Sequence, residues 1–221
     1  MRIIAGTLRR RRLLAPPDAQ ITRPITDRVK QSLFDRLASS GIFRPDETEP
    51  PPGSPAKPLG KADPKSRVGF GLDLFAGVGC LGLEALSRGI GSFVFIERNR
   101  PICNLLERNV ADLQLSQRAD VMNMDVLGAG WIGLLPRKPL RLVFCDPPYD
   151  LVRDPEDMAR INTLIEDLGP KAEIGGILVL RTDGDTAPPE SAGWHRPVTM
   201  AFGSMAVHLY SRPDLESGGG G

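Results

Sequence analysis

Two hydrophobic patterns alternate along most of the chain. Short, nearly continuous apolar runs predict strands at 68–75, 92–96, 119–122, 140–145 and 174–180. Apolar residues at helical spacing predict helices at 81–87, from Asn99 to Leu113 and at 154–168, with a short helical stretch near 126–135. The segments 198–202 and 205–210 alternate around Gly203-Ser204, which predicts an antiparallel hairpin. This order predicts an α/β fold with a mostly parallel, doubly wound sheet and helices on both faces.

The first 43 residues follow a different pattern. Two short strands, 2–6 and 13–15, are expected around a run of arginines. Thr26 is placed as the N-cap of a helix with apolar residues at every fourth position, and Gly41 is placed to end it. Residues 44–66 contain seven prolines and almost no large apolar side chains, which is typical of a linker. We therefore expect a basic N-terminal extension of hairpin and helix at 1–43, a linker at 44–66, an α/β domain at 67–212 and a disordered tail at 213–221.

The apolar runs, the cysteines and the histidines of the sequence indicate a protein of the cytoplasm without a metal site. No apolar run reaches the roughly 18 residues of a membrane helix, and the N-terminus lacks the apolar core and cleavage site of a signal peptide. The three cysteines form no CxxC pair, so we expect reduced thiols and a cytoplasmic protein. His195 and His208 have no partner at metal-ligand spacing, so we expect no metal, and we expect His208 at the surface of a terminal strand.

Charge is distributed unevenly along the chain. The net charge is +1, but residues 1–36 carry nine Arg or Lys against three Asp. A basic end on a mildly acidic body predicts contact with a polyanion, and a solvated surface arm is the alternative. The run Arg9–Arg12 fits phosphate contacts that position a protein on RNA without reading its sequence.

The first strand of the α/β domain runs into a glycine-rich turn. Gly77, Gly79 and Gly82 spell GxGxxG, in which glycine lets the backbone turn sharply and approach a ligand. A dinucleotide site uses the same spacing, with a pyrophosphate at the helix N-terminus. Asp73, four residues before Gly77, would repel a pyrophosphate but suits a cationic amino-acid moiety. An NAD-dependent oxidoreductase therefore remains only as an alternative.

Two more carboxylates follow the next strands. Glu97 ends the second strand, where it can accept both hydroxyl hydrogens of a ribose, and Asp125 follows the third, where it can accept from an adenine amino group. Together with Asp73 they predict a pocket for S-adenosylmethionine. A solvated loop charge is the alternative for Glu97, and a helix N-cap is the alternative for Asp125.

The fourth strand ends in the sequence Asp146-Pro147-Pro148-Tyr149. The prolines fix the backbone and remove two donors, so the carbonyls of Asp146 and Pro147 are available as acceptors. An exocyclic amine of a base is weakly nucleophilic, and hydrogen bonds from it to the Asp146 carboxylate and the Pro147 carbonyl would orient its lone pair. Tyr149 would stack on the base. The motif predicts methyl transfer to an amine by positioning and electrostatics, without a metal or a covalent nucleophile.

Three segments of the chain carry a resemblance to a known family. The segments 73–89, 146–149 and 23–34, in which Arg23 begins Arg-Pro-Ile-Thr-Asp-Arg, resemble the bacterial RsmD family. Those enzymes methylate the N2 amine of a guanine in small-subunit ribosomal RNA. The resemblance implies a class I S-adenosylmethionine-dependent methyltransferase fold with a Rossmann-like seven-strand sheet and an N-terminal β-hairpin extension. It also implies that the helix at 26–28 lies by the cofactor cleft and that an assembled or partly assembled small ribosomal subunit is the substrate. The long proline-rich linker departs from the family pattern.

The sequence thus predicts an rRNA (guanine-N2)-methyltransferase that is monomeric. Another amine as target (adenine N6 or a protein glutamine) and a non-catalytic ribosome-assembly factor remain as alternatives. The expected catalytic residues are Asp146, Pro147 and Tyr149. The expected S-adenosylmethionine-binding residues are Asp73, Phe75, Gly77, Gly79, Glu97, Asp125 and Asp146. The expected RNA-binding residues are Arg9, Arg10, Arg11, Arg12, Arg23 and Arg28.

Overall fold

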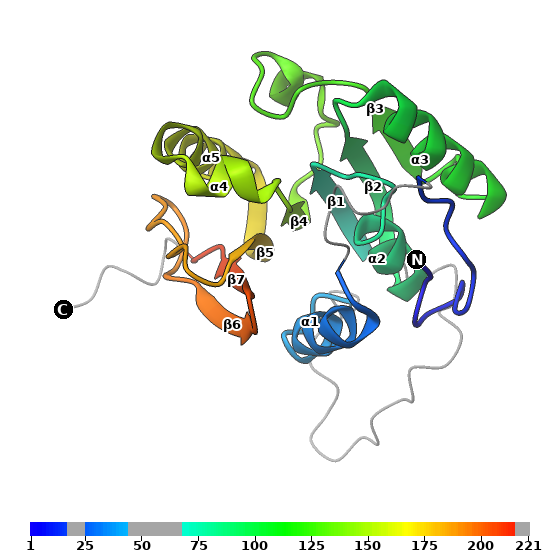
Figure 1. Ribbon diagram of the computed structural model, residues 1–221, viewed down its shortest axis with the longest axis horizontal. Coiled ribbons are helices and arrows are strands. Elements are labelled where there is room, and N and C mark those ends of the chain that lie inside the picture. Colours follow the sequence, from blue (N-terminus) through cyan, green and yellow to red (C-terminus); the bar gives the residue numbers. More distant parts are fainter. Residues whose placement is uncertain (17–24, 44–67, 215–221) are drawn as a thin grey trace.

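The computed structural model describes residues 1–16, 25–43 and 68–214. They form one seven-stranded sheet in the order β3-β2-β1-β4-β5-β7-β6 (Figure 1). The first five strands are parallel, and β7 and β6 close the sheet as an antiparallel hairpin beside β5. The strands are β1 (Val68–Leu74), β2 (Ile90–Ile96), β3 (Ala119–Met122), β4 (Leu140–Cys145), β5 (Ala172–Asp183), β6 (Val198–Phe202) and β7 (Met205–Ser211). The expected doubly wound α/β sheet with a closing hairpin is confirmed.

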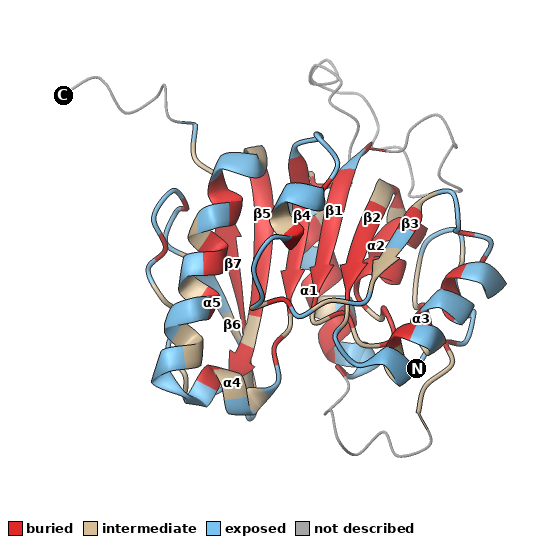
Figure 2. Cartoon of the chain, turned by 90° about the horizontal axis from the view of Figure 1, so that it is seen from above, coloured by how far each residue is buried: buried red, intermediate tan, exposed pale blue. Residues whose placement is uncertain are grey.

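Helices cover both faces of this sheet. Alternate residues of the strands point to opposite faces: in β4, Phe144 packs with α1, α2 and α3, whereas Val143 packs with α4 and α5. Figure 2 shows the strands as a buried band with exposed helix faces outside it. The helices are α1 (Asp27–Ser39), α2 (Gly82–Arg88), α3 (Arg100–Asp112), α4 (Tyr149–Arg153), α5 (Pro155–Leu168) and the 3-10 turns η2 (Trp131–Leu134) and η3 (Gly169–Lys171). No helix in these ranges is long and apolar enough to cross a membrane.

The expected helix starts are confirmed at the level of single hydrogen bonds. The Thr26 hydroxyl accepts from the backbone N–H of Val29 and begins α1, and the Asn99 side chain accepts from Ile102 and begins α3. Asp154 accepts from two backbone N–H groups of the first turn of α5. Side-chain acceptors of this kind satisfy donors that have no partner within the helix.

The two expected strands at the N-terminus do not form a ladder. Within the described part of the chain, Arg2 and Arg12 make an isolated antiparallel bridge instead. Backbone hydrogen bonds from Ile3 to Arg11 and from Leu13 to Met1 flank this bridge, so residues 1–3 and 11–13 pair over a short stretch. The N–H groups at positions 4, 5, 8 and 14 donate to side chains of α2 and α3. Residues 1–16 therefore lie along these helices as an arm, and "the arm" denotes these residues below.

Other differences from the expected elements have local causes. The helical stretch expected near 126–135 is reduced to η2, because three glycines interrupt it and Gly130 has a φ of 92°. The helix α4 was not expected, since a single turn has no apolar repeat. The strand β5 is longer than 174–180, because its polar ends also pair with β4 and β7. The expected linker at 44–66 and residues 215–221 of the expected tail lie outside the described residues.

Candidate active site

The sheet topology brings the predicted acidic residues to one edge. The chain leaves β1 toward β2 on one side and returns to β4 on the other, which makes the gap between β1 and β4 the switch point where open α/β sheets bind ligands. Asp73 lies near the carboxyl end of β1, and Asp146 directly follows β4 with its backbone N–H donating to the Leu74 carbonyl. Two carboxylates that are 73 positions apart in sequence thus lie on neighbouring strands.

Asp73 and Glu97 hold the two ends of the glycine-rich turn. The Asp73 carboxylate accepts from the backbone N–H of Gly82 at 2.9 Å, and the Glu97 carboxylate accepts from Gly77 at 2.9 Å. Gly77 and Gly79 have φ values of 54° and 83°, a region that favours glycine. A Cβ at Gly82 would lie 2.4 Å from the Phe95 ring, so the turn can pack against β2 only with glycine there. The three glycines therefore shape a turn that both carboxylates fasten.

Burial makes Asp73 an unusual carboxylate. Its side chain is buried, and this desolvation raises its pKa well above the ordinary value, against the hydrogen bond from Gly82, which lowers it. The nearby carboxylates Asp146 and Glu97 raise the pKa of Asp73 further. A buried carboxylate of this kind is stabilised by an incoming cation, as an amino group would be.

The remaining predicted cofactor residues differ in exposure. Glu97 is half-buried, and its second oxygen accepts from the backbone N–H of Asn99 at 2.7 Å, so it is not a free loop charge. Asp125 is exposed and accepts from Leu127 at 3.0 Å within its own turn. Phe75 is partly buried at the start of the glycine-rich turn, with a φ of 57°. The ligand contacts expected of these three residues remain predictions.

The Asp146-Pro147-Pro148-Tyr149 motif lies at the same edge, and the structure adds a residue that the sequence analysis missed. Arg181 follows the apolar run of β5, and its Nε lies 2.5 Å from Oδ1 of Asp146 as an ion pair. Burial raises the pKa of Asp146, and Arg181 acts to lower it. A signal was present: parallel pairing sets Cys145 opposite Leu180, so the next residues on both strands are neighbours.

Tyr149 lies between two arginines. Its ring centre is 5.8 Å from the guanidinium carbon of Arg153 and 5.9 Å from that of Arg181. Its hydroxyl is buried and has no hydrogen-bond partner among the described residues. Pro147 is buried beside it. A buried hydroxyl without a hydrogen-bond partner lowers the stability of the fold, and such groups are typical of sites that bind a ligand.

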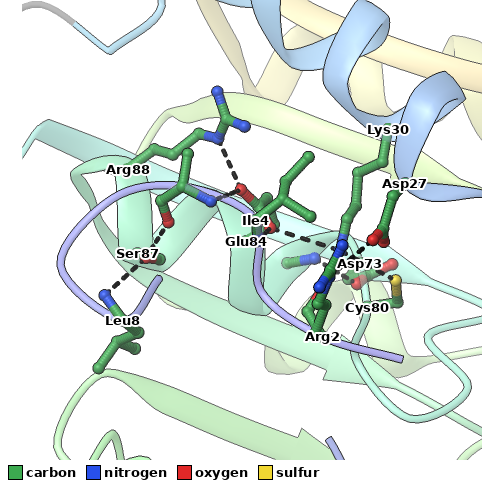
Figure 3. A network of polar contacts seen from close by, with 12 residues as sticks. Arg2, Ile4, Leu8, Asp27, Lys30, Asp73, Cys80, Glu84, Ser87 and Arg88 are labelled. Atoms are coloured by element: carbon green, nitrogen blue, oxygen red, sulfur yellow. Dashed lines mark hydrogen bonds and ion pairs between the residues drawn. The ribbon is translucent and has the colours of Figure 1, made fainter. Parts of the chain in front are cut away.

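A buried ion network attaches the arm to the back of the glycine-rich turn (Figure 3). The buried carboxylate of Glu84 accepts from the backbone N–H groups of Ile4 and Ala5 and contacts Lys30 Nζ at 3.4 Å and Arg88 Nε at 2.8 Å. Lys30 is also buried and donates to the Arg2 carbonyl. No residue of this network was expected from the sequence, because charged residues inside helix patterns are typical of solvated faces.

The predicted RNA-binding arginines are exposed where the structure describes them. Arg9, Arg10, Arg11 and Arg12 lie on the arm, and Arg28 lies in the first turn of α1. The neighbouring Leu8 is bonded to Ser87, at the far end of α2 from Asp73, and Arg11 donates to the Asp112 carbonyl at the end of α3. The Leu8 end of the arginine run thus lies at the opposite end of α2 from Asp73, whereas Arg12 bridges to Arg2, whose carbonyl accepts from Lys30 beside Cys80. Arg23 lies outside the described residues.

Comparison with known proteins shows the family to which the chain belongs. The family model described as "Conserved hypothetical protein 95" matches residues 1–211. The chain belongs to this family. It is 31% identical over 214 residues to ribosomal RNA small subunit methyltransferase D of Escherichia coli strain K12, covering 96% of this chain and 90% of that protein.

Solved structures have the same fold. A hypothetical protein of Thermus thermophilus superposes with a TM-score of 0.67 at 26% identity, covering 96% of this chain and 99% of the other. An RNA methyltransferase of Salinibacter ruber in complex with S-adenosylhomocysteine has a TM-score of 0.53 at 13% identity, covering 86% and 94% of the two chains. The protein thus has the seven-stranded sheet of class I S-adenosylmethionine-dependent methyltransferases, as expected. Its described residues contain no group of three His, Cys, Asp or Glu side chains arranged to hold a metal ion.

Proposed function

We propose that the protein transfers a methyl group from S-adenosylmethionine to the exocyclic N2 amine of a guanine in small-subunit ribosomal RNA. The observation that carries this proposal is the position of Asp146 at the switch point of the sheet: it follows the strand that pairs with the strand of the buried Asp73, and Tyr149 begins the helix directly after it. The family relationship to ribosomal RNA small subunit methyltransferase D supports the choice of RNA as substrate.

The residues around the glycine-rich turn fit S-adenosylmethionine. A Cβ at Gly77 would meet nothing within 4 Å, so the space over this residue is open to a ligand. Asp73 offers a buried carboxylate to the amino group of the methionine moiety, Glu97 offers acceptors to the ribose hydroxyls, and Asp125 offers an acceptor to the adenine amino group. S-adenosylmethionine supplies a methyl group on a sulfonium, which makes that methyl electrophilic.

The motif after β4 orients the other reactant. The Asp146 carboxylate and the Pro147 carbonyl accept hydrogen bonds from the guanine amine and direct its lone pair toward the methyl group. Tyr149 stacks on the base, which leaves the helix of the RNA to reach the site. These residues act by positioning and by electrostatics.

Exposed arginines hold the RNA backbone. Arg9, Arg10 and Arg12 project from the fastened arm, and Arg28 projects from α1. We include Arg11 in this surface, and an RNA-binding role for Arg23, which lies outside the described residues, is part of the proposal from the sequence alone. Because phosphate contacts carry no sequence information, we expect the shape of the ribosomal subunit to select the guanine.

The test is transfer of labelled methyl to small ribosomal subunits from cells that lack the gene. The variant Asp146→Ala should lose about 100-fold or more of the rate, as expected when a positioning acceptor is removed. Asp150→Ala is the matched control, since Asp150 is exposed in the same short helix. Binding of S-adenosylhomocysteine, measured by calorimetry, should persist in both variants.

Each outcome has a definite meaning. Label recovered as N2-methylguanosine at one site, and lost in Asp146→Ala, supports the proposal. Label on an adenine or on a protein keeps the chemistry and replaces the substrate. Full turnover by Asp146→Ala removes this residue from catalysis, and bound cofactor without any transfer indicates a non-catalytic assembly factor.

A further inference from the structure

Arg181 stands at the centre of the proposed site without a role in the mechanism above. It follows Leu180, whose neighbour across the parallel pair is Cys145, and its side chain is only 11% exposed. Its Nε approaches Oδ1 of Asp146 to 2.5 Å, and its guanidinium lies beside the Tyr149 ring. One arginine thus contacts both side chains that are assigned to the base.

The charge of Asp146 depends on what surrounds it. Its side chain is 19% exposed. The uncharged titratable groups at this edge are Cys80 of the glycine-rich turn, Cys145 on β4 and Tyr149 on α4. The charged groups are the carboxylates Asp73 and Glu97 and the cations Lys30, beside Cys80, Arg153, beside Tyr149, and Arg181 on β5. Of the three cations, Arg181 is the one that forms an ion pair with Asp146, whereas Lys30 pairs with Glu84 and Arg153 pairs with Asp183.

The protonation state decides what Asp146 can do. An ionised carboxylate accepts hydrogen bonds at both oxygens, whereas a protonated one donates from one of them. The guanine amine donates through its N–H groups before transfer, and one of its two protons leaves when the N–CH3 bond forms and the S–CH3 bond breaks. It therefore needs an acceptor, whereas a protonated Asp146 presents a donor at one oxygen. The contact with Arg181 also fixes the carboxylate from one side, through Oδ1.

We propose that Arg181 is a positioning residue for methyl transfer: its guanidinium keeps the Asp146 carboxylate charged and oriented toward the target amine. This inference rests on the proposed function. Arg181 acts through Asp146 and does not itself exchange a proton with the base. The same guanidinium lies 5.9 Å from the centre of the Tyr149 ring.

The test compares Arg181→Met with Arg181→Lys. Methionine keeps an unbranched side chain but removes the positive charge. Lysine restores the charge but not the planar guanidinium group, which can form two parallel hydrogen bonds. The single-turnover rate with saturating cofactor and subunits is measured against pH. For Arg181→Met we expect the acid limb to be displaced to higher pH, so that the rate one pH unit below the new midpoint falls about tenfold and recovers as the pH rises.

A second readout separates this inference from the proposed function. The 13C carboxyl resonance of Asp146, assigned by its loss in Asp146→Ala, is titrated in the protein bound to S-adenosylhomocysteine. We expect a higher titration midpoint in Arg181→Met and a midpoint closer to wild type in Arg181→Lys. Arg153→Met is the matched control, because Arg153 lies equally close to the Tyr149 ring but pairs with Asp183.

The outcomes are distinguishable. A displaced acid limb and a displaced carboxyl titration in Arg181→Met, both absent in Arg153→Met, support the inference. An unchanged titration midpoint of Asp146 in Arg181→Met overturns it, even if the rate falls. If wild type methylates no guanine but the midpoint still moves, the electrostatic role of Arg181 stands and the proposed reaction fails.

Discussion

Asp73 is a residue that lowers the stability of the folded protein at neutral pH and suits the binding of a cationic ligand. Its carboxylate is 2% exposed and is held by a backbone N–H of the turn that it shapes. Because its pKa is raised in the folded chain, the folded state binds more protons than the unfolded one over the pH range between the two pKa values. Its contribution to stability is therefore greatest in acid and is lost as the pH rises through that range.

Asp73→Asn should therefore stabilise the protein at neutral pH and weaken the cofactor site. The amide oxygen still accepts from Gly82, but the side chain carries no charge that must be buried. The midpoint temperature of thermal unfolding should therefore rise by about 2–4 °C for each kcal/mol of stability gained. Calorimetry should show at least about tenfold weaker S-adenosylhomocysteine binding, the equivalent of about 1.4 kcal/mol. Asp120→Asn, at an exposed position of β3, should change neither quantity. A less stable Asp73→Asn protein at neutral pH would contradict the assignment.

At the residue scale the sequence predicted those site members that a strand-end pattern marks. Asp73, Glu97 and Asp146 each end or follow an apolar run, and the structure places them at one edge of the sheet. Arg181 also ends such a run and was missed because a basic residue after a strand is typical of a solvated surface. Glu84 and Lys30 could not be predicted, since their partners are backbone atoms of the arm 80 and 28 positions away.

At the scale of elements, the arm and α2 behave as one unit. Glu84 is fully buried with two basic side chains and two backbone N–H groups as partners. Gly6 has a φ of 79°, and a Cβ there would lie 2.0 Å from the Ser87 carbonyl oxygen, so the arm runs directly against the helix. Sequence patterns predicted the helices well because their periodicity and caps are local. The two predicted strands of the arm meet in one antiparallel bridge with its flanking hydrogen bonds, and the contacts of the arm with distant side chains of α2 and α3 could not be predicted from local patterns.

Glu84→Gln should detach the arm and destabilise the whole domain. Loss of one partner in a buried ion network leaves Lys30 and Arg88 without their anion, at a cost of about 3–5 kcal/mol in urea unfolding. Trypsin should cleave at Arg9–Arg12 faster in this variant. The matched control is Glu107→Gln, since Glu107 pairs with Arg100 at 4.0 Å on the surface, where the change should cost less than about 1 kcal/mol. Equal costs for both variants would refute the network.

At the scale of the whole molecule, His208 ties the antiparallel edge together. Its Nε2 lies 2.9 Å from the Thr182 hydroxyl on β5, and its Nδ1 lies 2.8 Å from the Thr199 hydroxyl on β6. Burial lowers the pKa of His208 to about 4. The alternation of the sequence predicted the hairpin, but the expected surface position of His208 is wrong, because alternation alone does not say that both faces of this edge are covered.

His208 should make global stability depend on pH. The folded pKa lies below the ordinary value near 6.5, so the unfolded chain binds the proton first. Stability from this residue is complete above about pH 6.5 and falls toward pH 4, by up to about 1.4 kcal/mol per pH unit. In His208→Gln, the free energy of unfolding measured in urea should depend less on pH between about 4 and 6.5. In His195→Gln, at an exposed position, the slope of this free energy against pH should be unchanged. An unaltered slope in His208→Gln would exclude this origin.

The order of the charged residues along the chain has a consequence for synthesis. Asp73 and Asp146 leave the ribosome before Arg181, which pairs with Asp146 only after β5 has joined β4. Until then the nascent sheet would bury two like charges on neighbouring strands without their cation, at a high desolvation cost. The edge of the sheet that is assigned to catalysis is therefore the last part of the centre to close. We therefore expect the centre of the sheet to close only after the segment that carries Arg181 has been translated.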